Sequence, residues 1–141
     1  MKPDDEVLGA VGFSVMSVRP GDTALVMGTS DLPVVSTSHL LHIIESAAVG
    51  ALAEHLDTGE TSYLISSSID LSGTAQVGDQ LRATARCTFI EAIGISAREL
   101  TFECDVYSEE RHIATATIKR ATVERVSFLA RTAAEELLAE G

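Results

Sequence analysis

The chain has 141 residues, of which 45% are hydrophobic, so it can bury the core of one domain spanning 1–141. Ten Lys+Arg against 21 Asp+Glu give a formal net charge of −11, which argues against nucleic acid and acidic membranes as partners, because both need a basic surface. The two cysteines are too few for a disulfide scaffold or a zinc site. With no run of roughly 20 apolar residues and an acidic N-terminus, we expect a cytoplasmic protein with reduced thiols.

The first predicted elements are a strand and a long helix. Residues 11–19 alternate in part between apolar and polar side chains, which indicates a strand. The helix is predicted over 37–57, with N-caps available in 36–38 (STS) and a left-handed C-cap at Gly59. Its apolar residues cover more than half of the circumference, so we expect burial on several sides: Leu40, Leu41, Ile43, Ile44, Ala47, Ala48, Ala51 and Leu52.

After this helix the apolar period changes from 3.6 to 2, which predicts antiparallel strands joined by short connections. The alternation indicates strands near 63–67, 81–89, 95–107 and 112–126, with a hairpin turn at 108–111. Two strands show the pattern most clearly. Their core-facing residues are expected to be Leu81, Ala83, Ala85, Cys87 and Phe89 in one strand and Leu100, Phe102, Cys104 and Val106 in the other.

The order of these elements predicts an α+β fold. One helix cannot cover both faces of such a sheet, so we expect the sheet to curl around the helix at 37–57. The tail 129–140 (LARTAAEELLAE) is predicted to be a short acidic amphipathic helix. The apolar helix and the open sheet edges together favour a homodimer formed through strand edges and central helices.

Three stretches carry a resemblance to a known family: LPVVSTSHLLHIIESAAVGAL, HLDTGETSYLISSSIDLSGTAQVGDQLRATA and HIATATIKRATVERVSF. They resemble the hotdog-fold thioesterases, and within them the small bacterial group that includes fluoroacetyl-CoA thioesterase. The resemblance covers roughly residues 20–128. It implies an antiparallel sheet wrapped around one long central helix. It also implies hydrolysis of a small acyl thioester, with coenzyme A as part of the substrate and no other cofactor.

The resemblance places five positions of the family's site on this chain. In the family a threonine begins the central helix and a glutamate follows eight residues later, which matches Thr37 and Glu45. The family's histidine, seven residues before a turn glycine, falls on Leu71, and a small glycine seven residues upstream of it falls on Leu64. The family's G-T-H-E-R motif matches ATIKR and retains its arginine as Arg120. The resemblance thus implies that Thr37 orients Glu45 and that Leu64, Leu71 and Arg120 line the substrate pocket.

Glu45 is also unusual on the residues alone. On a helical wheel it lies between Leu41 and Ala48, inside the apolar stripe. Burying a carboxylate there costs several kcal/mol unless it is paired. One interpretation is a general base or nucleophile that acts on a thioester carbonyl. The other is an acid paired structurally with an arginine or exposed at a dimer seam.

His39, His42 and Glu45 follow one another at intervals of three residues on the predicted helix. His42 could replace the missing histidine and work with Glu45, while His39 would contact the substrate. A metal site on these three side chains would lack a fourth ligand, so no metal is predicted. The simplest alternative is that both histidines are polar residues at a pocket edge or dimer interface. Thr37 likewise has a simpler role as a helix cap.

Two functions remain open from the sequence. The first is an acyl-CoA thioesterase in which Glu45 acts as base or nucleophile. The second is a non-catalytic protein that binds acyl-CoA or a similar small ligand, because Leu71 and Leu64 make the pocket drier and tighter. In both cases the arginines that fall in the sheet half of the chain could hold the phosphates of coenzyme A or could pair with acids on neighbouring strands.

Overall fold

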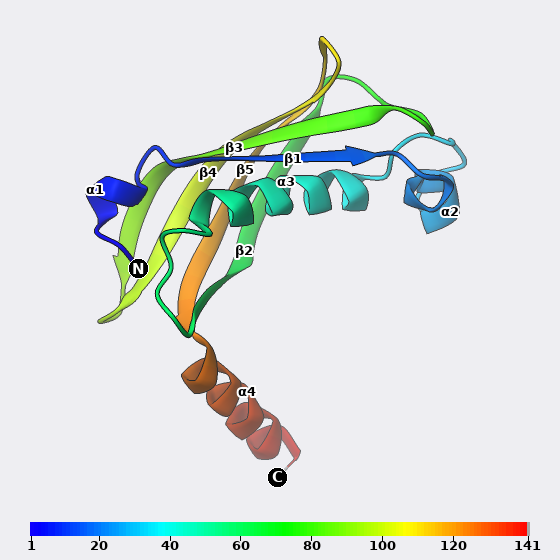
Figure 1. Cartoon of the computed structure of the whole chain (residues 1–141). Coiled ribbons are helices and arrows are strands. Elements are labelled where there is room, and N and C mark those ends of the chain that lie inside the picture. The colour runs from blue at the N-terminus through cyan, green and yellow to red at the C-terminus, as the bar shows by residue number, and fades with distance from the viewer. Residues whose placement is uncertain (141) are drawn as a thin grey trace.

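A computed structural model describes residues 1–140. Five antiparallel strands form one sheet around the central helix α3 (Thr37–Leu52), so the predicted α+β class is confirmed (Figure 1). The sheet order is β1-β3-β4-β5-β2, which leaves β1 and β2 as edge strands. Within residues 1–140, no helix combines the length and the apolar character that crossing a membrane requires. The strands are β1 (Val11–Ser17), β2 (Glu60–Leu71), β3 (Gln80–Ile93), β4 (Ala97–Ser108) and β5 (Arg111–Glu124).

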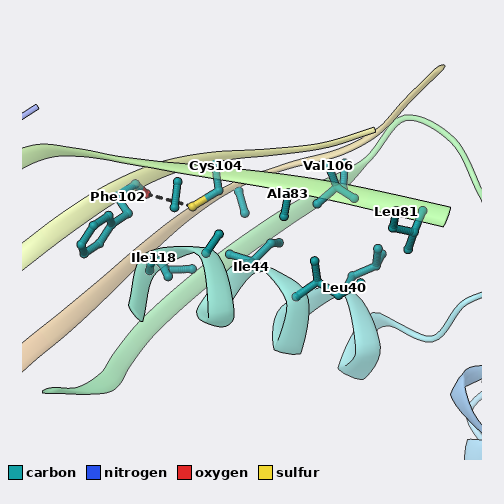
Figure 2. Close-up of a cluster of buried hydrophobic side chains, with 14 of the residues drawn as sticks. Leu40, Ile44, Leu81, Ala83, Phe102, Cys104, Val106 and Ile118 are labelled. Atoms are coloured by element: carbon teal, nitrogen blue, oxygen red, sulfur yellow. Dashed lines mark hydrogen bonds between the residues drawn. The ribbon is translucent and has the colours of Figure 1, made fainter. Parts of the chain in front are cut away.

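The core lies between α3 and the concave face of the sheet. Leu40 and Ile44 point from the helix toward the strands, which contribute side chains such as Phe102 and Ile118 to the same core cluster (Figure 2). All four of these side chains are fully buried. Burial of each Leu, Ile or Phe side chain contributes about 1.5–3 kcal/mol, so this layer holds the helix against the sheet. The apolar helix predicted at this position is therefore confirmed as the centre of the core.

Edge strand β1 approaches α3 closely at Gly12. A Cβ atom at this position would overlap the carbonyl oxygen of Ala47 and would lie 2.5 Å from the backbone nitrogen of Ala51. Only glycine therefore allows the strand backbone to lie directly on the helix backbone. Small residues on the facing side of the helix, Ala47 and Ala51, serve the same close approach.

Both predicted helices have different bounds in the structure. The central helix ends at Leu52 rather than near residue 57, because the chain tightens into turns in which the His55 N–H bonds the Leu52 carbonyl. Gly59 does take the left-handed conformation, with φ of 84°, but it ends those turns rather than the helix. At the other end, α4 (Arg125–Glu140) begins four residues earlier than predicted, because Glu124 accepts a hydrogen bond from the Ser127 N–H and caps it.

The inward and outward faces of the strands follow the predicted alternation except at Phe89. The core positions of β4 and the first four of β3 are buried, but Phe89 is 58% exposed. The register between β3 and β4 shifts between Cys87 and Phe89, where a bulge adds one residue and reverses the facing of the remaining residues of the strand. Ile90 packs against the core in place of Phe89.

Three short helical segments were not predicted: α1 (Asp4–Val7), the 3₁₀ helix η1 (Pro20–Asp22) and α2 (Ala24–Met27). Each has only three or four residues, which is too short for a hydrophobic period to reveal. The segment that contains η1 and α2 leads into α3 and fixes the position of its N-terminus: the Ser36 N–H bonds the Asp22 carbonyl.

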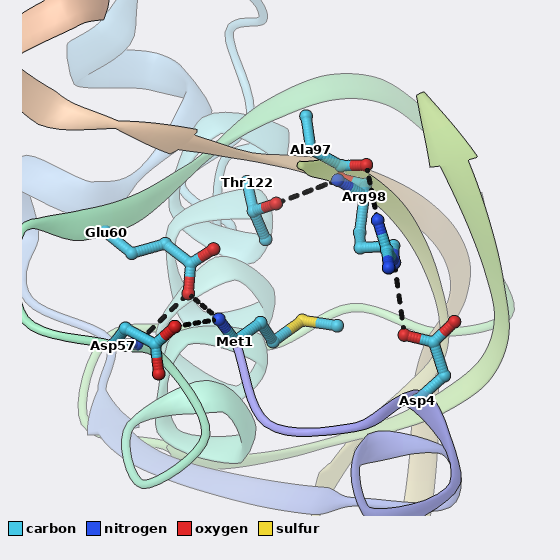
Figure 3. Close-up of polar contacts among 7 residues, drawn as sticks. All are labelled: Met1, Asp4, Asp57, Glu60, Ala97, Arg98 and Thr122. Carbon is cyan, nitrogen blue, oxygen red and sulfur yellow. Dashed lines mark hydrogen bonds and ion pairs between the residues drawn. The ribbon is translucent and has the colours of Figure 1, made fainter. Parts of the chain in front are cut away.

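The N-terminal amine is held by two carboxylates after α3. The Met1 ammonium lies 2.5 Å from Asp57 and 2.6 Å from Glu60 (Figure 3). Burial alone would lower the pKa of this amine, but the hydrogen bonds and charges of Asp57 and Glu60 outweigh it and raise the pKa above 8.0. A second contact, from Arg98 Nε to Asp4, ties the same N-terminal segment to β4.

This cluster predicts a pH-dependent part of the stability. Because the folded-state pKa of the Met1 amine is raised, its contribution is complete below about pH 8 and is lost as the pH rises through the folded-state value. We expect Glu60→Gln to lower the melting temperature at pH 7 and to have little effect at pH 10.5. Thermal unfolding at both pH values, with the exposed Glu54→Gln as control, checks this. An equal effect of Glu60→Gln at both pH values would contradict it.

Candidate functional site

Glu45 is held by a buried arginine from the sheet. Arg120, on β5, donates from Nη1 to Oε1 of Glu45 at 2.7 Å. Its other nitrogens bond Ser62 at the start of β2: Nε to the hydroxyl at 3.0 Å and Nη2 to the carbonyl at 3.0 Å. The Arg120 side chain is 7% exposed and that of Glu45 is 32% exposed. The Arg120 guanidinium is thus held by three hydrogen bonds, and the Glu45 carboxylate that it binds lies partly at the protein surface.

This geometry leaves Glu45 both paired and accessible. Among residues 1–140, the carboxylate's hydrogen bond is made through Oε1, while Oε2 has no such partner. A charged hydrogen bond to a buried guanidinium fixes the orientation of the carboxylate. The pairing with an arginine, one of the two interpretations of Glu45, is therefore present in the structure. This pairing is compatible with the other interpretation, a general base or nucleophile, because Oε2 of Glu45 can still accept a proton.

Thr37 lies at the start of α3, on the surface. The capping role belongs to Ser36, whose hydroxyl accepts a hydrogen bond from the His39 N–H at 3.1 Å, so Thr37 is not the cap. Eight residues of helix span about 12 Å, so the Thr37 hydroxyl does not reach the Glu45 carboxylate of the same chain. Its predicted role in orienting Glu45 remains a prediction.

The two leucines of the predicted pocket lie far apart on β2. Leu64 is half-buried and pairs with Arg120 in the register with β5, next to the Glu45 ion pair. Leu71 is 49% exposed, and seven residues of strand separate it from Leu64, about 23 Å. It lies at the end of the sheet where the chain after β2 meets the start of α3, since the Val35 N–H bonds the Ala75 carbonyl.

The predicted site residues therefore form two groups within one chain. The first is Glu45, Arg120 and Leu64, near the middle of α3. The second is Thr37 and Leu71, at the N-terminal end of the helix. The structure does not bring the two groups together in a single chain. The family resemblance, by contrast, implies one pocket for all five residues.

The two histidines of α3 lie in its N-terminal half, toward the end of the helix that carries Thr37. His39 is buried, with Nδ1 3.5 Å from Asp22, and it borders a cavity of about 270 Å³ with Met16, Ser17 and Arg19. Its Nε2 has no hydrogen-bond partner among residues 1–140. His42 is exposed, with its ring centroid 6.3 Å from that of His39. Within residues 1–140, no three His, Cys, Asp or Glu side chains converge as metal ligands. The roles predicted for His39 and His42 at the pocket remain predictions.

Ser62 is the residue of this site that the sequence did not reveal. It is tied to Arg120 through both its hydroxyl and its carbonyl. A single serine in a strand carries no signal of its own, and only the pairing of β2 with β5 places it beside the guanidinium. No motif in the sequence could have identified it.

A second histidine-centred cluster lies on the outer face of the sheet. Nδ1 of His112 is 2.6 Å from the Ser72 hydroxyl, and Nε2 is 3.0 Å from Asp105. Asp105 and His112 are next to buried residues of β4 and β5, and side chains alternate along a strand, so both face away from α3. The Ser72 hydroxyl also lies 3.1 Å from the His112 carbonyl, so the cluster fastens the end of β2 to β4 and β5.

The cysteines are not candidates for a nucleophile. Cys87 and Cys104 are free and buried, as predicted from their positions on the inward faces of β3 and β4. Desolvation by burial raises the pKa of the Cys87 thiol to about 11 and that of Cys104 to about 12. Both remain protonated near neutral pH, and a thiol is a weak nucleophile until it ionises.

Comparison with known proteins bears on the fold and on the family. The chain superposes on a variant of fluoroacetyl-CoA thioesterase FlK, solved in complex with fluoroacetate, with a TM-score of 0.79 and 20% identity over 91% of this chain and 97% of that one. It also matches a thioesterase superfamily member from Thermus thermophilus (TM-score 0.78, 19% identity, 94% and 96% covered). A hot-dog-like protein from Thermanaerovibrio acidaminovorans superposes with a TM-score of 0.77 and 22% identity, over 93% of this chain and 95% of that one. No curated protein matches the chain.

These superpositions confirm the hotdog fold that the resemblance implied. The family comparison reaches further, because the model described as fluoroacetyl-CoA-specific thioesterase matches residues 18–126, which is most of the chain and includes both groups of site residues. The chain belongs to the fluoroacetyl-CoA-specific thioesterase family.

Proposed function

We propose that this protein is an acyl-CoA thioesterase that hydrolyses a small acyl thioester, with Glu45 as the base or nucleophile. One observation supports this most directly: a one-third-exposed carboxylate is fixed at one oxygen by a buried arginine, and its other oxygen has no hydrogen-bond partner within residues 1–140. Membership of the family supports the reaction class. A cytoplasmic location and the absence of a cofactor other than coenzyme A itself remain predictions.

Two forms of the reaction suit this carboxylate. As a base, Glu45 takes a proton from water while the water oxygen attacks the thioester carbonyl, and collapse of the tetrahedral intermediate expels the coenzyme A thiolate, which takes up the proton. As a nucleophile, the carboxylate oxygen attacks the carbonyl directly to give an anhydride and the thiolate, and water then cleaves the anhydride. In both forms Arg120 holds Oε1 and leaves Oε2 to act.

The separation of the two residue groups supports a homodimeric site. β2 is an edge strand, so its free side can pair with β2 of a second copy and remove an exposed edge. An antiparallel pairing reverses one strand, which carries Leu71 of one protomer toward Leu64 of the other. Thr37 and the free N–H groups at the start of α3 would then approach Glu45 of the other protomer and polarise the thioester carbonyl there. This is the homodimer through strand edges and central helices that the sequence predicts.

A second function is supported by Leu71. This position carries a leucine where the family has a histidine, and its side chain cannot transfer a proton. A protein that retains the pocket but has lost hydrolysis would bind acyl-CoA without turnover.

One pair of measurements separates the two functions. Release of free thiol from a panel of short-chain acyl-CoAs is followed with wild type and with Glu45→Ala, and the same compounds are titrated calorimetrically. The proposed hydrolase releases thiol with at least one substrate and loses that activity in Glu45→Ala. Saturable binding with no thiol release would support the binding function. No binding and no release would contradict both.

A further inference from the structure

The C-terminal helix α4 has an apolar face that no other part of residues 1–140 covers. The helix has 16 residues, about 24 Å, and it projects from the end of β5 away from the sheet (Figure 1). None of its residues is buried. The family match ends at residue 126, in the first turn of α4, so most of the helix lies outside the matched region.

One side of α4 is apolar from Val126 to Leu137, and Glu140 lies on the same side in the last turn. Val126, Leu129, Ala133 and Leu137 follow at intervals of three and four residues, which places them within about 80° of arc. The three larger side chains are 59–70% exposed. Phe128 projects from the opposite side and stacks on Tyr63 of β2, with ring centroids 5.1 Å apart. That contact anchors the helix to the domain and turns the apolar face, as defined by these four residues, outward.

The charges of α4 are arranged against its own dipole. The basic residues Arg125 and Arg131 lie in its first half, whereas Glu135, Glu136 and Glu140 lie in its second half, with no acid in the first turn and no base in the last. In an isolated helix this order is unfavourable, because the N-terminus carries partial positive charge and the C-terminus partial negative charge. A 16-residue helix is also marginal on its own in water. The charge order favours a partner of reversed direction, and the marginal stability favours packing of the helix against a partner.

We propose that the apolar face of α4 binds α4 of a second copy of this chain, antiparallel, with the two-fold axis at Ala133. In this register Leu129 of each helix lies opposite Leu137 of the other, and the small Ala133 residues meet at the crossing and allow the backbones to approach. Arg125 of each chain lies beside Glu140 of the other. Each helix places its basic end against the partner's acidic end, and the two dipoles oppose one another. The contact is two-fold and separate from the β2 edge.

Cysteine cross-linking tests the pairing directly. Ala133→Cys places two thiols at the crossing, where helices about 8–10 Å apart bring their Cα atoms within disulfide distance. Glu135→Cys is the matched control, because it lies two residues away on the opposite side of the helix. The native thiols are buried and do not compete. Under mild oxidation we expect Ala133→Cys to form covalent dimers on the order of tenfold faster than Glu135→Cys.

The direction of pairing is tested by mixing two variants. Leu129→Cys and Leu137→Cys should each cross-link poorly alone, since eight residues separate like positions in an antiparallel pair, and should cross-link readily when mixed. In sedimentation at wild-type concentrations, Leu137→Asp should lower the native mass while circular dichroism shows the domain folded. Equal cross-linking of Ala133→Cys and Glu135→Cys, or none from Ala133→Cys, would overturn the pairing. Efficient cross-linking of each leucine variant alone would overturn its direction.

Discussion

Glu45→Gln is expected to lower kcat for thioester hydrolysis by about 10²–10⁴-fold, which is the range that a positioned general base contributes. The amide oxygen of glutamine can still accept the hydrogen bond from Arg120, so the side chain keeps its place beside the guanidinium. What it loses is the negative charge and the ability to take a proton. The change therefore acts on the chemical step, and KM should move much less than kcat.

The measurement must separate chemistry from stability. Glu45→Gln leaves the largely buried Arg120 without a counter-ion, and removing one partner of a buried pair destabilises a protein, by up to about 3–5 kcal/mol for full burial and by less here because Glu45 is one-third exposed. Rates are therefore compared well below the melting temperature of the variant, with circular dichroism at the assay temperature. Glu54→Gln, an exposed glutamate just after α3, is the matched control and should keep the wild-type rate.

An outcome in which Glu45→Gln retains the wild-type kcat would remove Glu45 from the chemistry and leave its pairing with Arg120 as its only role. A loss that follows the unfolded fraction at each temperature would give the same conclusion. A loss of kcat in a fully folded variant supports the base or nucleophile. Formation of an anhydride intermediate, trapped by hydroxylamine in wild type, would then favour the nucleophile over the base.

Gly12→Ala is expected to lower the free energy of unfolding by about 3 kcal/mol, at the upper end of the usual cost of overpacking. The added Cβ would overlap the α3 backbone at the Ala47 oxygen, and backbone atoms in a helix cannot rotate away as a side chain can. The edge strand β1 must shift from the helix, which loosens its contact with the core. Urea unfolding monitored by circular dichroism measures the change.

Gly21→Ala is the control for this prediction. Gly21 is exposed, and a Cβ there meets nothing within 4 Å, so the change should stay within about 0.5 kcal/mol of wild type. A Gly12→Ala variant as stable as Gly21→Ala would mean that β1 does not lie against the helix backbone as described.

The order of elements could be predicted because each depends on a local pattern. The 3.6-residue period of the central helix and the alternation of β3 and β4 involve neighbouring residues only, and burial agrees with them at Ile44, Leu81 and Phe102. The exceptions have local causes that a period does not reveal. A one-residue bulge turned Phe89 to the surface, and the Glu124 carboxylate started α4 early.

The candidate site was predictable in part for a different reason. Glu45 could be singled out because an acid inside an apolar stripe is costly, and Thr37 because its spacing from Glu45 matches the family. Neither observation could show that Arg120 lies 2.7 Å from Glu45, since the two residues are 75 positions apart and meet only when β5 packs against α3. Ser62 was missed for the same reason.

Hydrophobic period and capping depend on neighbours along the chain, so the amino-acid order was enough to predict most of the buried residues, the start of the long helix and the acid that is out of place. Three further facts came from the packing of distant segments. The first is that Arg120 holds Glu45, and the second is that Thr37 and Leu71 lie away from Glu45 within one chain. The third is that α4 presents an apolar face outward. They depend on strand register and on contacts between elements far apart in the chain. No local pattern specifies the strand register or the contacts between distant elements. A shift of one residue in the register, for example, would exchange the two faces of a strand.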